Sequence, residues 1–185
     1  MNRQTHYLVL ILLLLLPSCG IFAQETPQNS EKKNIGLFHL DTQFNTFQKN
    51  LKIGNYGAGF DVFFAKRFYG GVNLRNELDI LKQDNIKHSF RNTLIGVELG
   101  SYLCQDKEDA LDLRLSVSVP IGSRSWKYFC YEAGIYKHYE LKFMELILGA
   151  GCRYYDSYKA NFKNQFAVFG SFGVGFTIKD PKTKR

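Results

Sequence analysis

Alternation of apolar and polar side chains is the feature that most constrains how this 185-residue chain folds. The run 164–179 reads NQFAVFGSFGVGFTIK, in which large apolar residues alternate with small or polar ones. One face of that run holds Phe166, Val168, Phe172, Val174, Phe176 and Ile178. Because successive side chains of a strand point to opposite faces, a period of two predicts a β-strand with one apolar side.

The same pattern recurs in eight runs, which are separated by clusters of charged or turn-forming residues. We expect strands near 34–48, 55–65, 69–80, 89–103, 111–120, 127–138, 141–155 and 164–178. No helical periodicity longer than one turn interrupts them. Eight is an even number, as bacterial single-chain outer-membrane barrels require. The pattern therefore predicts an all-β protein, an eight-stranded antiparallel up-and-down transmembrane β-barrel.

The N-terminal segment has the composition of a secretory signal peptide. Arg3 precedes an unbroken apolar run from Leu8 to Leu16, which is too short for a transmembrane helix of roughly 20 residues. A small residue before a polar segment predicts cleavage after Ala23. A lipoprotein signal is the alternative, because the residues before Cys19 resemble a lipobox and Cys19 would then be lipidated. Either signal takes the chain out of the cytoplasm.

These features divide the chain into a signal peptide (1–23), a disordered polar lead-in (24–33), the barrel (34–179) and a short C-terminal tail (180–185). The part after the signal is long enough for one domain. The formal net charge of +7 falls to +6 when the signal, with its single Arg3, is removed. Cys104, Cys130 and Cys152 lack a paired spacing, so we expect neither a metal site nor a redox role for them.

Two observations predict that the polar faces of the strands point into the barrel. The lysines of the mature chain lie near expected strand ends, in turns or in the flanks, whereas a soluble barrel would scatter lysine over its surface. The polar faces are also rich in glycine, and a crowded eight-stranded lumen favours small residues. These glycines are Gly57, Gly59, Gly71, Gly96, Gly100, Gly134, Gly149, Gly151, Gly173 and Gly175.

Aromatic residues near both ends of the runs suit the interfacial girdles of a membrane barrel, although aromatics are enriched in any strand. Together, the strand number, the alternation, the signal and the run from Phe166 to Ile178 resemble the small outer-membrane barrels of the OmpA and OmpX type. The resemblance covers residues 34–178, rests on no short motif and carries over no functional residues. It implies an outer-membrane location and the barrel assembly machinery as a partner. Such barrels often end on an aromatic signal for assembly, which here would be Phe176 or Ile178.

Charged residues on the inward faces form the first candidate site, a lumen ionic network. Buried charges persist only when they are paired and hydrogen-bonded, so we expect salt bridges that plug the barrel. A narrow ion path is the alternative, because acids outnumber arginines on these faces. The candidate members of the network are Arg75, Glu98, Arg114, Glu132, Glu145 and Arg153.

Catalysis is a third possibility, because some eight-stranded barrels modify lipid A. A histidine-serine deacylase would place the two residues two apart on one strand face. No His-x-Ser occurs, and the nearest pairs are His39 with Asp41 and His138 with Glu140. We therefore expect no enzyme, no cofactor and no metal.

A basic rim is expected at one end of the barrel, which is the outer end if the N-terminus is periplasmic. It would suit lipopolysaccharide phosphates, although exposed loops are basic for solubility as well. Only Asp84 and Asp156 oppose the cations there, and the loops are short. The rim residues are Lys49, Lys52, Lys82, Lys87, Arg124, Lys127, Lys159 and Lys163.

The most favoured role is a monomeric structural or envelope-interaction barrel that contacts outer-membrane lipid and binds no nucleic acid. A small ion or solute channel, a lipid A-modifying enzyme and a soluble periplasmic carrier of the lipocalin type remain as alternatives. The soluble carrier would turn its apolar faces inward instead of outward.

Overall fold

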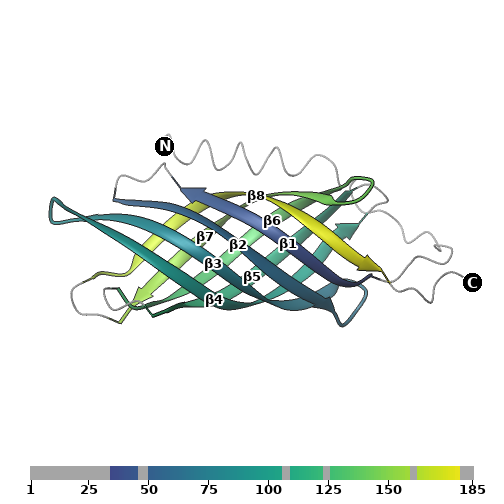
Figure 1. Ribbon diagram of the computed structural model, residues 1–185, viewed down its shortest axis with the longest axis horizontal. Coiled ribbons are helices and arrows are strands. Elements are labelled where there is room, and N and C mark those ends of the chain that lie inside the picture. Colours follow the sequence, from purple (N-terminus) through teal and green to yellow (C-terminus); the bar gives the residue numbers. More distant parts are fainter. Residues whose placement is uncertain (1–33, 46–49, 106–108, 123–125, 159–161, 180–185) are drawn as a thin grey trace, which may run out of the picture.

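Eight antiparallel strands close into a barrel in the computed structural model, which describes residues 34–45, 50–105, 109–122, 126–158 and 162–179 (Figure 1). Each strand pairs with the next along the chain, and β8 closes the barrel on β1 with Leu40 opposite Val174. The predicted up-and-down order of eight strands is confirmed. The strands are β1 (Asn34–Asn45), β2 (Leu51–Phe63), β3 (Phe68–Gln83), β4 (Ile86–Gln105), β5 (Asp109–Ile121), β6 (Tyr128–Glu140), β7 (Glu145–Ser157) and β8 (Gln165–Lys179).

The expected signal peptide with its cleavage after Ala23, the alternative lipid site at Cys19, the lead-in and the tail lie outside the described residues. Within the described residues, no helix has the length and apolarity needed to cross a membrane.

Three connections differ from the sequence prediction. The spacing of the expected strands predicts a loop at 81–88, and this prediction is wrong. β3 and β4 continue to a two-residue turn at Asp84 and Asn85. Both turn residues have positive φ, 50° and 63°, as hairpin turns that match the right-handed strand twist require. The turn expected at 139–140 lies instead at 141–144, where the amide of Leu141 donates to the carbonyl of Met144 at 2.8 Å. β2 begins at Leu51, within the segment expected as a loop at 49–54.

The two faces of the strands differ in polarity as expected, with polar side chains inward. In β4, Val97 and Leu99 are each 60% exposed, whereas Glu98 between them is 2% exposed. Inward glycines make room for large side chains. A Cβ on Gly100 would lie 2.0 Å from the ring of Tyr69. Leu111 is an exception to the alternation of β5: it lies two residues before the outward Leu113, but it is beside a register shift between β4 and β5 and is buried.

The interior is polar at mid-height and apolar at the end where Trp126 lies, and at the other end rings such as Tyr102 pack beside His138. We call the end that carries the β1–β2, β3–β4, β5–β6 and β7–β8 connections the loop end, and the end that carries Asn34 and Lys179 the terminal end. At the loop end, Trp126 packs on Tyr128 and Phe90 with ring centroids 4.6 and 5.2 Å apart. The rings at this end, which we call the aromatic cap, belong to Phe90, Trp126, Tyr128, Tyr155 and Phe162.

Candidate functional site

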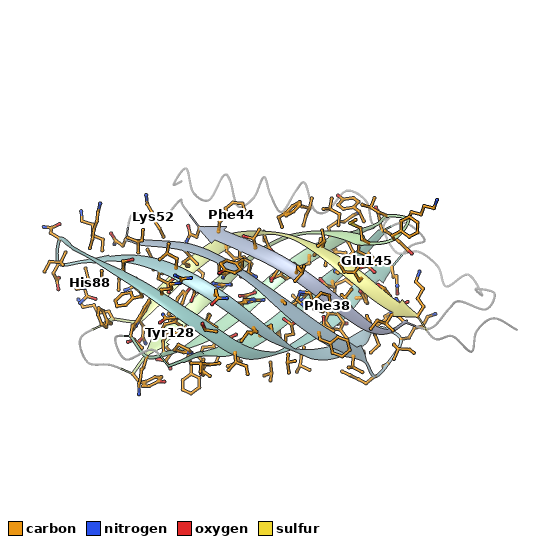
Figure 2. All side chains as sticks on the ribbon, viewed as in Figure 1. Phe38, Phe44, Lys52, His88, Tyr128 and Glu145 are labelled. Carbon is orange, nitrogen blue, oxygen red and sulfur yellow. The ribbon has the colours of Figure 1, made fainter. Side chains whose placement is uncertain are left out.

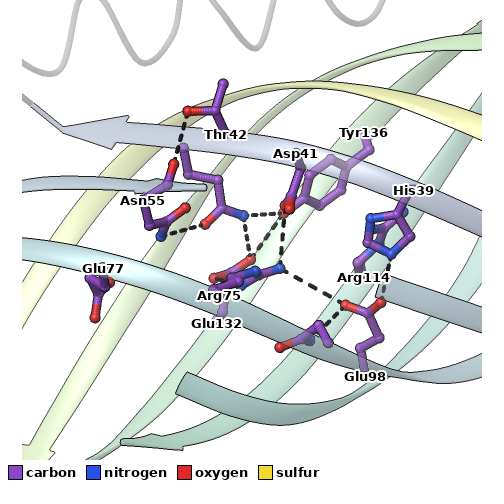
Figure 3. Close-up of polar contacts among 12 residues, drawn as sticks. His39, Asp41, Thr42, Asn55, Arg75, Glu77, Glu98, Arg114, Glu132 and Tyr136 are labelled. Carbon is purple, nitrogen blue, oxygen red and sulfur yellow. Dashed lines mark hydrogen bonds and ion pairs between the residues drawn. The ribbon is translucent and has the colours of Figure 1, made fainter. Parts of the chain in front are cut away.

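Glu132 of β6 is the centre of the polar interior (Figure 3). Its carboxylate accepts hydrogen bonds from Arg75 Nη1 at 2.9 Å and from Arg153 Nε at 2.8 Å. Gln43 Nε2 and the hydroxyl of Tyr136 also donate to it, both at 3.0 Å. All five side chains are buried. One carboxylate therefore bridges two guanidinium groups that would otherwise repel each other across the lumen.

Glu77 joins this centre to the aromatic cap. Arg153 Nη1 donates to Glu77 Oε1 at 2.6 Å. The hydroxyls of Tyr155 and Tyr128 donate to the two oxygens of the same carboxylate at 3.0 and 2.7 Å. The polar ends of two cap residues are thus satisfied by the network, while their rings pack at the loop end.

Toward the terminal end, Arg75 approaches two further acids. Its Nη2 lies 3.5 Å from Asp41 Oδ2 and 4.0 Å from Glu98 Oε2. Glu98 Oε2 accepts from Asn73 Nδ2 at 3.0 Å, and its Oε1 lies 3.0 Å from His39 Nε2. Figure 3 shows this chain of contacts crossing the lumen from β6 to β4.

A second cluster lies nearer the terminal end. Arg114 Nη2 lies 3.4 Å from Asp112 Oδ2, and its Nε donates to the hydroxyl of Tyr69 at 3.1 Å. Tyr69 in turn donates to Asp112. His138 lies between two acids. Its Nε2 is 3.5 Å from Asp112 Oδ2, and its Nδ1 is 3.0 Å from Glu145 Oε2.

The structure brings four of the six sequence-derived network residues into one set of contacts, namely Arg75, Glu98, Glu132 and Arg153. Arg114 and Glu145 belong to the second cluster. Sequence reasoning missed Gln43 and His39 as network members. The available signal was their position on the same face of β1 as Asp41, two residues away on either side.

The two histidine-acid pairs considered for catalysis are not contacts in the structure. His39 contacts Glu98 and Asp61 rather than Asp41, and His138 contacts Glu145 and Asp112. In the described part of the chain, neither imidazole is hydrogen-bonded to a serine hydroxyl.

The described rim residues are all exposed and belong to the loop end, where Figure 2 labels Lys52. They are Lys52, Lys82, Lys87, Lys127 and Lys163. Lys49, Arg124 and Lys159 lie outside the described residues. On β8, Phe176 and Ile178 point outward and are 41% and 48% exposed. Phe176 stacks on Phe38 of the adjoining β1, with ring centroids 6.5 Å apart.

Comparisons with known proteins identify no family. No family model matches the chain, and no curated protein matches it. Seventeen chains of solved structures match it in fold. One comes from work described as de novo design of transmembrane beta-barrels; it is 9% identical, with a TM-score of 0.49 over 81% of this chain and 100% of that chain.

Proposed function

We propose that this protein is an integral outer-membrane β-barrel with a structural or envelope-interaction role, and that its lumen is closed. One observation carries the proposal. The barrel exposes its apolar side chains and buries its charges, which is the reverse of a water-soluble protein. A soluble carrier of the lipocalin type would instead line its interior with apolar groups for a ligand.

The outward apolar face runs from strand to strand without a charged interruption at mid-height. Val72, Val97 and Val117 are opposite one another on β3, β4 and β5, and they are 55%, 60% and 38% exposed. A continuous exposed apolar surface marks contact with lipid or with another apolar surface. The export signal expected at residues 1–23 favours lipid of the outer membrane.

Two features support a closed lumen over a conducting one. The ionic network joins side chains of β1, β3, β4, β6 and β7 across the interior. Above it, Trp126 and Tyr128 are 0% exposed, so the aromatic cap fills the loop end. A hydrated ion would have to displace both layers.

The partners that we propose for the barrel follow from the residues that it exposes. The exposed lysines at the loop end would contact lipopolysaccharide phosphates through charge-assisted hydrogen bonds. The outward aromatic end of β8, with Phe176 and Ile178, would be read by the barrel assembly machinery. Neither contact requires a reaction or a cofactor, and the barrel would act as a monomer.

Membrane fractionation combined with heat-modifiable gel migration tests the membrane assignment. We expect the protein in the outer-membrane fraction, and we expect folded and boiled samples to migrate differently. Recovery in the soluble fraction with no difference in migration would refute the assignment.

Planar bilayer recording separates the closed barrel from a channel. We expect no steady conductance from the wild-type protein. A steady conductance that changes in Glu98→Gln would show that the lumen is an ion path and not closed, because Glu98 lies within the lumen network. Incubation with lipid A tests catalysis in the same preparation. Fatty acid release that is lost in His39→Ala or His138→Ala would establish an enzyme instead.

A further inference from the structure

Three ligating side chains from three strands converge in the lumen between the network and the terminal end. His39 of β1 places its Nε2 3.0 Å from Glu98 Oε1 of β4 and 3.6 Å from Asp61 Oδ2 of β2. One nitrogen and two carboxylate oxygens of these residues all lie within 4.8 Å of one another. The residues are 1%, 2% and 0% exposed.

The spacing of the three atoms suits a divalent transition-metal ion. Tetrahedral ligands at 2.0–2.1 Å from zinc are about 3.3 Å apart, and the two distances from His39 Nε2 lie on either side of that value. Imidazole with two carboxylates is a donor set for such ions, whereas Mg²⁺ and Ca²⁺ prefer oxygen alone.

Asp61 provides an independent sign that this set of side chains holds a cation. Neither of its carboxylate oxygens has a hydrogen-bond partner among the described residues, although the side chain is fully buried. Its neighbour His39 is hydrogen-bonded to Glu98 rather than to Asp61. A buried carboxylate without a hydrogen bond is strongly destabilising, and a bound cation would remove that penalty.

Two glycines leave space at these ligand atoms. A Cβ on Gly71 would lie 2.0 Å from Asp61 Oδ1, and a Cβ on Gly59 would lie 2.2 Å from His39 Nε2 and 3.1 Å from Glu98 Oε1. Asn73 holds Glu98 in place by donating to its other oxygen at 3.0 Å. Outer-shell hydrogen bonds of this kind orient metal ligands.

The charge balance of the lumen also favours a cation. Seven buried carboxylates face three buried arginines and Lys137, and Lys137 pairs with Asp109, which is not one of the seven. Arg75 Nη2 lies 4.0 Å from Glu98 Oε2, but the Nη1 of the same guanidinium donates to Glu132 at 2.9 Å. The buried carboxylates are Asp41, Asp61, Glu77, Asp79, Glu98, Asp112 and Glu132.

We propose that His39, Asp61 and Glu98 bind one divalent transition-metal ion inside the barrel, with Zn²⁺ as the probe. The ion joins β1, β2 and β4 and holds one imidazole and two carboxylates together. Phe63, Tyr69 and Tyr102 form a stack of rings nearer the terminal end, and the aromatic cap fills the loop end. The ion therefore enters while the barrel folds rather than afterwards.

The test is refolding of the full chain from urea into detergent micelles with Zn²⁺, followed by gel filtration and elemental analysis. We expect one tightly held zinc ion per wild-type chain and loss of that ion in Asp61→Asn. The matched control is Asp79→Asn, because Asp79 is also a fully buried lumen carboxylate without a hydrogen-bond partner among the described residues. It lies outside the triad, so this variant should retain the ion.

Heat-modifiable migration shows whether each variant has folded. If Asp61→Asn does not fold, Asn73→Ala keeps all three ligands and should weaken zinc binding by about 10- to 100-fold. Co²⁺ in the wild-type protein should give a nitrogen and oxygen ligand spectrum. Three results would overturn the proposal: no bound metal in the folded wild type, equal retention in folded Asp61→Asn, or a thiolate-to-cobalt band that places the ion on cysteine.

Discussion

Removing the charge of Glu132 should destabilise the barrel more than any other single carboxylate-to-amide change. Glu132→Gln keeps the size of the side chain but takes the negative charge from between Arg75 Nη1 and Arg153 Nε, at 2.9 and 2.8 Å. Breaking a buried ion pair costs about 3–5 kcal/mol, because the remaining charge stays buried without compensation. Arg153 retains Glu77 at 2.6 Å, and Arg75 retains only Asp41 at 3.5 Å and Glu98 at 4.0 Å. We therefore expect a loss of about 3–5 kcal/mol in the free energy of unfolding.

The matched control is Glu140→Gln. Glu140 pairs with Lys179 at the same distance, 2.8 Å, but the two side chains are 50% and 42% exposed. An exposed pair contributes about 0.2–1 kcal/mol, so this variant should unfold almost as the wild type does. Urea unfolding in lipid vesicles measures both, with the fluorescence of the single, buried Trp126 as the signal. Equal stabilities of Glu132→Gln and Glu140→Gln would refute the reasoning that the lumen network holds the barrel together.

Two further substitutions test the packing of the lumen. Gly100→Ala should lower the free energy of unfolding by about 1–3 kcal/mol, because the new methyl group overpacks against Tyr69, which is held by Asp112 and Arg114. Gly54→Ala is the control and should be neutral, because a Cβ at Gly54 would have nothing within 4 Å. Refolding yield on heat-modifiable gels compares the two, and equal yields would contradict the inward orientation of Gly100. Trp126→Ala should cost about 3–5 kcal/mol by leaving a cavity in the aromatic cap, measured by gel migration in urea. Phe143→Ala, at a turn residue that is 79% exposed, should change stability by less than about 0.5 kcal/mol. A similar loss of stability in Trp126→Ala and Phe143→Ala would contradict a tightly packed aromatic cap.

The sequence was sufficient for the architecture because one physical rule governs most of the chain. A strand between lipid-like and polar surroundings must alternate, and Val97, Glu98 and Leu99 follow that rule. The rule reverses at the loop end, where the inward side chains of β2 are Leu51 and Ile53 and the outward one is Lys52. Because of that reversal, the sequence pattern predicts a strand from residue 55, four residues after the observed start of β2 at Leu51.

The sites could be predicted only in part, since alternation gives the face of a residue but not its neighbours across the barrel. His39, Asp61 and Glu98 converge because β1 pairs with β2, β2 with β3 and β3 with β4 in one particular register. A register shift of two residues would separate them while keeping each side chain on its face, so alternation alone does not specify the register. The same limit explains why Arg114 was grouped with Glu132, although its partners are Asp112 and Tyr69.

The most direct test of the outward apolar face is the cost of an arginine at two equally exposed positions of β4. Val97 lies near the middle of the strand and Ile86 beside the hairpin turn, and each is 60% exposed. In a bilayer, arginine costs about 2–4 kcal/mol at the midplane and about 0–1 kcal/mol near the interface. The free energies of unfolding of Val97→Arg and Ile86→Arg in lipid vesicles should therefore differ by about 1–4 kcal/mol, with Val97→Arg the less stable. Equal stabilities would mean that the outer face of the barrel does not lie in lipid.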